Sequence, residues 1–226
     1  MLIRAWRNLP KNMQIEEVRP YYQALRQKAA SLFFKRLFDF FASLLLLILL
    51  SPVLFLLAIW IKIDSKGSVF FRQTRITSYG KEFQIYKFRT MVQDAEKLGH
   101  AVTIKQDPRI TRVGQKIRKT RLDELPQLLN VLAGSMSFVG TRPEVPKYVA
   151  HYTPEMMAPL LLPAGVTSLA SIKFKDEEKL LTASKDPDKT YIETILPQKM
   201  KINLDYLIQF RFGKDLKIAL MTVFKV

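Results

Sequence analysis

The sequence predicts an α+β fold, in which a re-entrant, broken membrane helix and an associated β-hairpin accompany a mainly helical cytosolic domain. The first observation is a run of residues, 40–61, without any charged side chain. The second is a pair of stretches rich in β-branched and aromatic residues, 69–76 and 82–88, which flank a loop containing Gly80. The third is the recurrence of helix-start signals through the rest of the chain. No internal repeat divides its 226 residues, which suits one soluble domain with appendages.

The apolar segment is long enough to cross a membrane. The run from Phe40 to Ile61 has 22 residues, and a spanning helix needs about 20. Residues 44–50 are apolar on every helix face, which is atypical of a small soluble core. A removable signal peptide is disfavoured because residues 1–31 carry polar and charged side chains throughout. We therefore expect contact with membrane lipids.

Pro52 predicts a break or kink in this segment. Proline lacks an N–H group, clashes with the carbonyl four residues earlier, and disfavours helical backbone at Ser51. The arms on either side, 40–50 and 53–61, are each about 15 Å long, which is half of a hydrocarbon core of ~30 Å. We expect a re-entrant hairpin within one leaflet, with the Ser51 hydroxyl bonded to a backbone group that the break sets free.

Basic residues flank both ends of the segment and favour the cytoplasmic side for both. Lys35 and Arg36 precede it, and Lys62 is the first of several that follow. Asp39 directly precedes the segment, and because a lone carboxylate is unfavourable in lipid, it would need Arg36 or a later base as a partner. The expected divisions are a basic amphipathic extension over 1–34, the membrane helix over 35–63, and a cytosolic domain with interfacial helices over 64–226.

Helix signals outside the membrane segment predict four further helices. The pattern predicts them over residues 21–31, 90–98 and 124–132, with an amphipathic end over 203–226.

The charge distribution indicates a negatively charged partner. The chain has a formal charge of +16, and residues 1–122 hold 23 basic and 8 acidic groups. Nucleic acid, anionic lipid headgroups and phosphorylated small molecules all fit such a surplus, as does a solvated basic face without a specific partner. The absence of cysteine excludes disulfides and thiolate chemistry and suits a reducing cytosol.

Two adjacent carboxylates, Asp123 and Glu124, form the most specific candidate site in the sequence. Because proline is tolerated only in a helix's first turn, Pro126 places a helix start near Asp123. Unpaired N–H groups at such a start favour a phosphate or a metal-bound phosphate. The alternative is an ordinary helix cap. Bases gather on both sides, with Arg118 upstream and Arg142 downstream, and this context suits phosphoryl chemistry.

The sequence resembles the bacterial sugar transferases of the small monotopic type, which act as polyprenyl-phosphate phosphoglycosyl transferases. The matching motifs run through most of the chain: Lys35 to Asp39, Ser51-Pro52, Lys87 to Met91, Asp107 to Thr111, Leu122 to Leu128, Arg142 to Glu144, and Leu216 to Ile218.

This resemblance implies a two-step reaction at the cytoplasmic face of a bacterial inner membrane. Asp123 attacks the sugar-bearing phosphate of a nucleotide sugar, usually a uridine one, and the phosphosugar then passes to a polyprenyl phosphate, usually undecaprenyl phosphate. Glu124 would hold Mg²⁺, and four basic residues would bind substrate: Lys87, Arg89, Arg118 and Arg142. Membrane lipids are expected partners and nucleic acid is not.

Departures from the family's pattern concern loops and the selection of substrate. Thr141, Ser68 and Thr77 replace usual glycine or proline positions, Ala170-Ser171 replaces a usual Trp-Gln, and residues 173–197 form a longer polar insert. The donor sugar, the glycan pathway and a homo-oligomer stay open. A membrane-attached nucleic-acid-binding protein and a scaffold without catalysis, in which Asp123 only caps a helix, are the rival interpretations.

Overall fold

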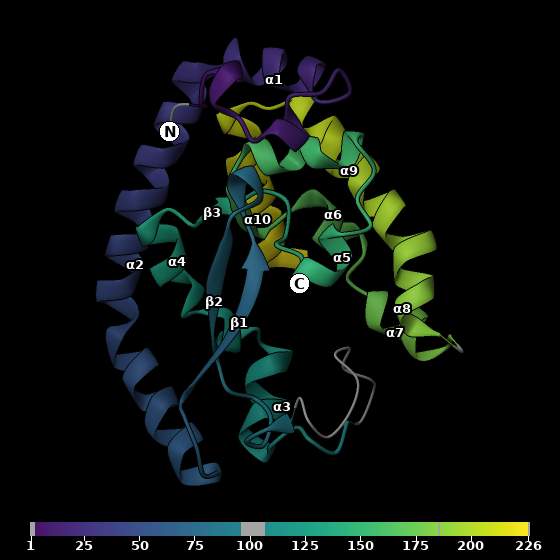
Figure 1. Ribbon diagram of the computed structural model, residues 1–226. Coiled ribbons are helices and arrows are strands. Elements are labelled where there is room, and N and C mark those ends of the chain that lie inside the picture. Colours follow the sequence, from purple (N-terminus) through teal and green to yellow (C-terminus); the bar gives the residue numbers. More distant parts are fainter. Residues whose placement is uncertain (1–2, 96–106, 185, 226) are drawn as a thin grey trace.

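The computed structural model describes residues 3–95, 107–184 and 186–225. It has mixed helix and sheet, as predicted, with the long helix α2 (Ala29–Asp64) along one side and shorter elements packed on its inner face (Figure 1). The strands are β1 (Phe70–Ile76), β2 (Glu82–Phe88), β3 (Met136–Val139) and β4 (Ala164–Thr167). The shorter helices are α1 (Arg19–Arg26), α3 (Arg112–Lys119), α4 (Gln127–Ala133), α5 (Pro146–Val149), α6 (Leu169–Lys173), α7 (Glu177–Thr182), α8 (Pro187–Thr190), α9 (Leu196–Ile208) and α10 (Phe212–Lys225).

The predicted hairpin is confirmed. β1 and β2 pair antiparallel, with Phe70 opposite Phe88 and Ile76 opposite Glu82. The connecting loop needs left-handed backbone at Tyr79 and Gly80, which have φ of 60° and 70°. Glycine adopts this conformation without strain, so the loop signal in the sequence has a direct structural cause.

The apolar segment is a single helix. Of the break or kink predicted at Pro52, the break is therefore wrong, and the kink stays a prediction. α2 stays helical through Pro52 and curves over its length (Figure 1). The Ser51 hydroxyl donates to the Ile48 carbonyl at 2.8 Å. That carbonyl is the one whose helical donor Pro52 lacks, so the predicted role of Ser51 is confirmed and explains how the helix passes through a proline.

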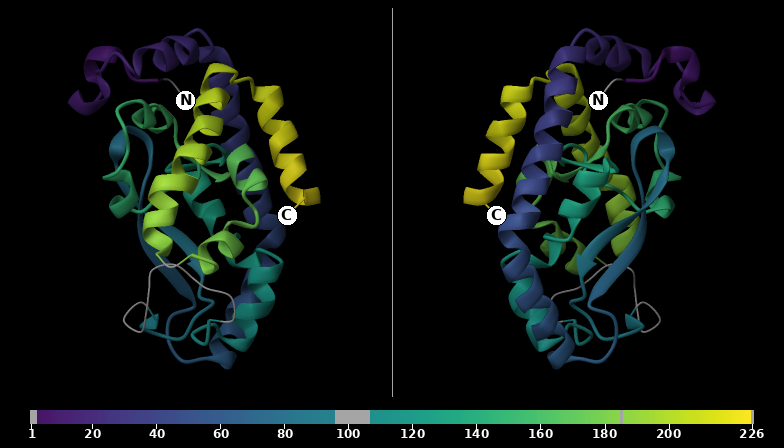
Figure 2. Two further views of the ribbon diagram at one scale, coloured as in Figure 1. Left: turned by 90° about the vertical axis from the view of Figure 1, so that its right-hand side faces the viewer. Right: turned by 90° about the vertical axis from the view of Figure 1, so that its left-hand side faces the viewer.

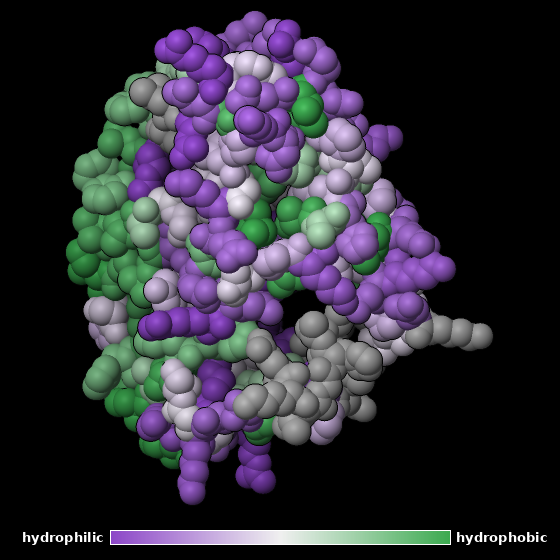
Figure 3. All heavy atoms as spheres, in the orientation of Figure 1, coloured by the Kyte–Doolittle hydropathy of each residue, from purple (hydrophilic) through white to green (hydrophobic). Residues whose placement is uncertain are grey.

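The outer face of α2 is apolar and uncovered. Leu49 is 63% exposed and Phe55 is 66% exposed, and hydrophobic side chains gather along this side of the molecule (Figure 3). Within the described residues, α2 is the one helix long and apolar enough to cross a membrane by length and composition. A core helix would be mostly buried, so this face is suited to lipid.

Both halves of α2 pack against the same body of the protein. In the first half, the buried Lys35 ammonium donates to Asp215 of α10 at 2.5 Å and to the Val139 carbonyl at 2.7 Å. In the second half, Leu57 and Ile61 are buried in a cluster with side chains of α3. The domain therefore holds one face of α2 in both halves of the helix.

Asp39 and Arg36 both have partners, but they do not pair as predicted. Asp39 accepts the Phe138 N–H at 3.2 Å. Arg36 donates to the Val131 and Leu132 carbonyls at 2.7 and 2.8 Å, at the C-terminal end of α4. A guanidinium is well placed there because the last carbonyls of a helix lack backbone donors.

Other helix boundaries differ from the prediction. The C-terminal region forms two helices, α9 and α10, which meet at a bend near Phe210, and α10 lies beside α2 (Figure 2). Residues 90–94 are not helical, Ala95 has 3₁₀ backbone, and residues 96–98 of the predicted helix lie outside the described residues. The chain before α2 packs on the core through Met13, Tyr22 and Leu25, so it is part of the folded body.

Strands β3 and β4 pair in parallel and position the loop that carries Arg142. Gly140 and Gly165 bring the two backbones so close that a Cβ atom on Gly165 would overlap the Gly140 backbone. Glycine is needed at this contact for space. The Gly165 N–H then donates to the Thr141 carbonyl at 2.8 Å, which holds the chain just before Arg142.

Candidate active site

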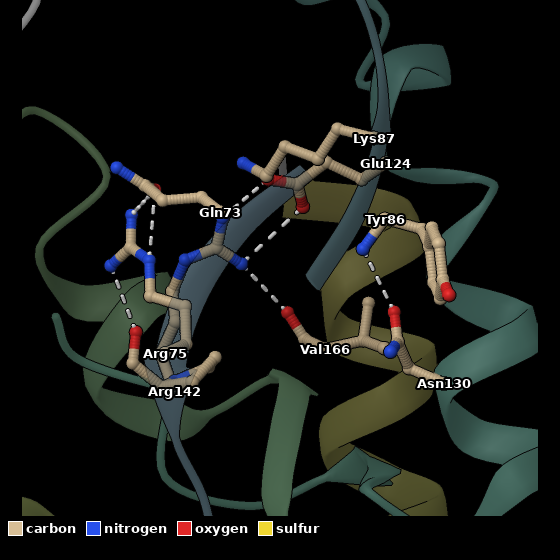
Figure 4. Close-up of polar contacts among 9 residues, drawn as sticks. Gln73, Arg75, Tyr86, Lys87, Glu124, Asn130, Arg142 and Val166 are labelled. Atoms are coloured by element: carbon tan, nitrogen blue, oxygen red, sulfur yellow. Dashed lines mark hydrogen bonds and ion pairs between the residues drawn. The ribbon is translucent and has the colours of Figure 1, made fainter. Parts of the chain in front are cut away.

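Glu124 is the centre of the site, between two bases from different parts of the chain. Its Oε1 atom accepts Lys87 Nζ of β2 at 2.9 Å and also accepts the Arg142 guanidinium. A second Arg142 nitrogen lies 3.3 Å from Oε2, and Arg142 also donates to the Val166 carbonyl at 2.9 Å. Figure 4 shows Lys87 and Arg142 converging on the Glu124 carboxylate. The structure thus brings three of the predicted residues together.

The ion pairs decide the charge of Glu124. Burial alone would raise its pKa, but the nearby charges of Arg142 and Lys87 and their hydrogen bonds outweigh burial and hold the pKa well below its usual range. The pKa of Arg142 is raised, chiefly by Glu124. Burial lowers the pKa of Lys87, although Glu124 opposes that shift. Glu124 is therefore ionised throughout the neutral range.

Asp123 is electrostatically different from its neighbour. Burial raises its pKa above the usual value, and the charge of Glu124 adds to the shift, whereas Lys87 and Arg118 oppose it. Within the described residues, no ion pair holds its carboxylate as Glu124 is held. Two adjacent carboxylates thus have opposite shifts, which is the pattern expected where two acids have different tasks.

The two carboxylates lie on a short turn that precedes α4. Asp123 and Glu124 lie in a 3₁₀ turn, Leu122–Glu124, and α4 begins only at Gln127, so the helix start predicted near Asp123 is three or four residues too early. Arg121 precedes the turn with φ of 54°, a left-handed conformation that is unfavourable for a residue with a side chain. Sequence reasoning missed Arg121, since nothing local marks an arginine for that conformation.

Arg118 and Arg89 occupy different positions relative to the cluster. Arg118, in the last turn of α3, is close enough to lower the pKa of Asp123 electrostatically. Arg89 is buried and donates to the Ser65 carbonyl at 2.7 Å and to the Lys66 carbonyl, just beyond the end of α2. The structure therefore places Arg118 within electrostatic range of Asp123 and uses Arg89 to hold the end of α2.

Arg75 is a further residue that sequence reasoning missed. It donates to the Pro143 carbonyl at 3.0 Å and to Gln73 Oε1 at 2.7 Å, so β1 holds the residue next to Arg142 (Figure 4). Side chains on a strand point alternately to its two faces, and this pattern on β1 is the one sequence signal that could have placed Arg75 near the site.

A pocket of about 260 Å³ opens beside Glu124 and Arg142. One wall comes from the middle of α2, and the others come from the 3₁₀ turn, α4, β3, β4, α6 and α10. Its lining includes apolar side chains, a buried amide and three hydroxyl groups: Leu46, Leu50, Leu125, Leu128, Phe138, Val166, Gln127, Thr167, Ser171 and Thr222. The pocket therefore lies between the charged cluster and the apolar helix α2.

The side chains of this site could bind Mg²⁺ only together with oxygen atoms of a bound substrate. No group of three or more acidic, histidine or cysteine side chains gathers anywhere in residues 3–95, 107–184 or 186–225. Mg²⁺ commonly uses one or two carboxylates together with phosphate oxygens and water. Glu124 Oε2, the oxygen farther from the bases, and the Asp123 carboxylate are of the right kind for such a site.

The fold and the site define a protein with one long, exposed apolar helix and a basic, carboxylate-bearing site for anions. A family profile described as "Bacterial sugar transferase" matches residues 30–226. The chain therefore belongs to the bacterial sugar transferase family, and the resemblance seen in the sequence is confirmed.

Characterised relatives carry the names of related activities. The chain is 38% identical over 196 residues, 84% of its length, to an undecaprenyl-phosphate glucose phosphotransferase of Komagataeibacter xylinus. It is 36% identical over 84% of its length to a UDP-glucose:undecaprenyl-phosphate glucose-1-phosphate transferase of Escherichia coli (strain K12). Over 66% of its length it is 39% identical to a putative undecaprenyl-phosphate N-acetylgalactosaminyl 1-phosphate transferase of Bacillus subtilis (strain 168).

The coverage of these relatives differs. The chain spans 35% of the Komagataeibacter protein and 39% of the Escherichia coli protein. It matches 83% of the Bacillus subtilis protein.

Proposed function

We propose that this protein is a phosphoglycosyl transferase that moves a sugar phosphate from a uridine diphosphate sugar to undecaprenyl phosphate. The observation that carries the proposal is the pair of adjacent carboxylates with opposite pKa shifts, set among Lys87, Arg118 and Arg142. The names of relatives support both substrates, since they include UDP-glucose and undecaprenyl phosphate. Such a reaction would begin the assembly of a lipid-linked glycan.

Asp123 is the nucleophile in this proposal. One of its carboxylate oxygens attacks the phosphorus that bears the sugar, and the bond from that phosphorus to the bridging oxygen breaks, so that uridine monophosphate leaves. A phosphate oxygen of undecaprenyl phosphate then attacks the same phosphorus and releases Asp123. Two displacements through a covalent intermediate let one carboxylate serve two substrates in turn. Among the residues that the structure describes, none forms an ion pair with Asp123, and this supports the role because a nucleophile must be free to move to phosphorus.

The bases stabilise charge on the transferred phosphate. Lys87 and Arg142 already point at one centre, and Arg118 lies near Asp123, so phosphate oxygens would meet donors that need little rearrangement. We assign Mg²⁺ to Glu124, where it would neutralise diphosphate charge when bound. Arg89 is left out of the substrate site because its donors serve α2.

We also propose that the protein sits on one face of the membrane, with the outer face of α2 in a single leaflet. The domain contacts both halves of α2. A straight span would carry α3 and its exposed charges, such as Lys116 and Lys119, across the bilayer. The same proposal keeps the division of the chain into an extension over 1–34, a membrane helix over 35–63 and a cytosolic domain over 64–226. The helix itself begins earlier than the predicted boundary, at Ala29.

The covalent intermediate can be tested by trapping. Purified protein incubated with Mg²⁺ and UDP-sugars labelled in the sugar should become labelled in the absence of undecaprenyl phosphate, and the label should transfer to the lipid when it is added. EDTA should prevent labelling. Oligonucleotide binding without any labelling, across a panel of UDP-hexoses and UDP-N-acetylhexosamines, would favour the nucleic-acid-binding alternative.

Topology can be tested with tags at Met1 and Val226. In spheroplasts, both tags are expected to be protected from externally added protease and to become accessible only after lysis. Digestion of one tag alone in intact spheroplasts would show a spanning helix and contradict the single-face arrangement.

A further inference from the structure

Two amides lie buried on α4, and their surroundings differ. Asn130 accepts the Tyr86 N–H at 3.0 Å and donates to the Gln84 carbonyl at 2.8 Å, which ties α4 to β2 (Figure 4). Gln127 has no measurable exposure. Neither its amide nitrogen nor its amide oxygen has a hydrogen-bond partner within the part of the chain that the structure describes. Asn130 is explained by the fold, and Gln127 is not.

The position of Gln127 connects it to the site. An unpaired buried amide is unfavourable, so each one calls for a specific explanation. Gln127 lines the pocket that also borders Glu124 and Arg142. It follows Glu124 by three residues, and residues three apart on a helical turn are neighbours, about 5–6 Å between Cβ atoms. A ligand group that bonds Gln127 would therefore lie close to the reacting phosphorus.

We infer that Gln127 is a specificity-determining residue that recognises the sugar ring of the donor in this pocket. The inference rests on the proposed function and deepens it. A sugar hydroxyl can both accept from the amide nitrogen and donate to the amide oxygen, so one ring can satisfy both atoms. A sugar is also joined to the transferred phosphorus through a single oxygen, which matches the short separation between Gln127 and Glu124.

The other parts of the two substrates fit less well. An isoprenoid chain has no hydrogen-bonding group and would leave the amide unpaired. The uracil base is separated from the sugar-bearing phosphorus by another phosphate and a ribose, so it lies farther away. The pocket volume of about 260 Å³ is just below the ~300–1,000 Å³ usual for drug-sized ligands, which suits one sugar ring. The hydroxyls of Thr167, Ser171 and Thr222 also line the pocket. Each already has a hydrogen-bond partner in the protein, so the Gln127 amide is the group that most needs a ligand partner.

Gln127→Met tests this role because it keeps the shape and removes the amide. Without ligand, the melting temperature is expected to rise, since an unpaired polar group is replaced by an apolar one. Asn130→Leu is the matched control on the same helix: it leaves the Tyr86 N–H and the Gln84 carbonyl without their partners, so its melting temperature should fall. A fall with Gln127→Met would contradict the inference.

Kinetics separate recognition of the sugar from a structural role. The wild-type protein should prefer one donor from a panel of UDP-hexoses and UDP-N-acetylhexosamines that includes UDP-glucose and UDP-N-acetylgalactosamine. Gln127→Met should lower kcat/KM for the preferred donor by about 10- to 100-fold and reduce the ratio between donors, with the affinity for UDP unchanged. Gln127→Glu, which retains one acceptor, serves as a second variant if the first does not fold.

Three outcomes of the kinetic experiment would also overturn the inference. An unchanged ratio of kcat/KM between donors would show that Gln127 does not recognise the sugar. An equal loss of affinity for UDP and for every donor would place the amide against the nucleotide. If the wild-type protein transferred phosphosugar from no donor in the panel, the proposed function would fail and the inference with it, whereas the first two outcomes leave the proposed function intact.

Discussion

Replacement of Asp123 by asparagine is expected to abolish phosphosugar transfer while the protein keeps its fold. Loss of a nucleophile costs about 10⁴-fold or more in turnover. The melting temperature should not fall, because burial already disfavours the charged form of Asp123, as its raised pKa indicates. A helix cap would behave in the opposite way, since its loss costs about 1 kcal/mol of stability and leaves chemistry untouched. Calorimetry combined with the trapping assay distinguishes the two roles.

The dependence on pH gives an independent check on Asp123. A raised pKa means that the carboxylate takes up a proton at a higher pH than the usual 3.8. The rate at which the labelled intermediate forms should therefore fall, on acidification, with an apparent pKa above that value. Label that still appears on Asp123→Asn, at a rate similar to wild type, would assign the nucleophile to another residue.

Replacement of Glu124 by glutamine is expected to destabilise the protein as well as inactivate it. The change leaves Lys87 and Arg142 close together without the carboxylate that pairs with both. Removing one partner of a buried ion pair costs about 3–5 kcal/mol. Both bases keep some exposure, 22% and 28% of their side chains, so we expect the lower end of that range. For a chain of this size, about 3 kcal/mol lowers the melting temperature by about 6–12 °C.

The control for Glu124→Gln is Glu82→Gln, which removes the same charge from an exposed position on β2. It should leave both stability and activity nearly unchanged. Because the pKa of Glu124 is lower in the folded state than its ordinary value of 4.5, its contribution to stability is present above pH 4.5 and is lost as the pH falls toward the folded pKa. Wild type should thus lose its stability advantage over Glu124→Gln in acid, and a difference that does not depend on pH would contradict the ion-pair explanation.

The family, the hairpin and the apolar helix could be predicted because each depends on local patterns. Three local patterns can be interpreted without knowledge of the tertiary structure. They are an uncharged run of 22 residues, Gly80 between two stretches typical of strands, and the motif around Asp123. The break at Pro52 could not be judged from the pattern. The Ser51 hydroxyl bonds the carbonyl that proline leaves without a donor, and the domain packs along both halves of α2, so the helix continues.

Tertiary structure alone decided how the candidate residues are used. The sequence by itself determined that Asp123 and Glu124 are adjacent and that bases surround them, but charges far apart in sequence set their pKa values, and only folding brings Lys87 and Arg142 to the same carboxylate. The same holds for Arg89, whose motif suggested substrate and whose donors hold the end of α2. It holds also for Gln127, whose amide is buried without a partner among the described residues. Such burial is a property of packing, which no local pattern records.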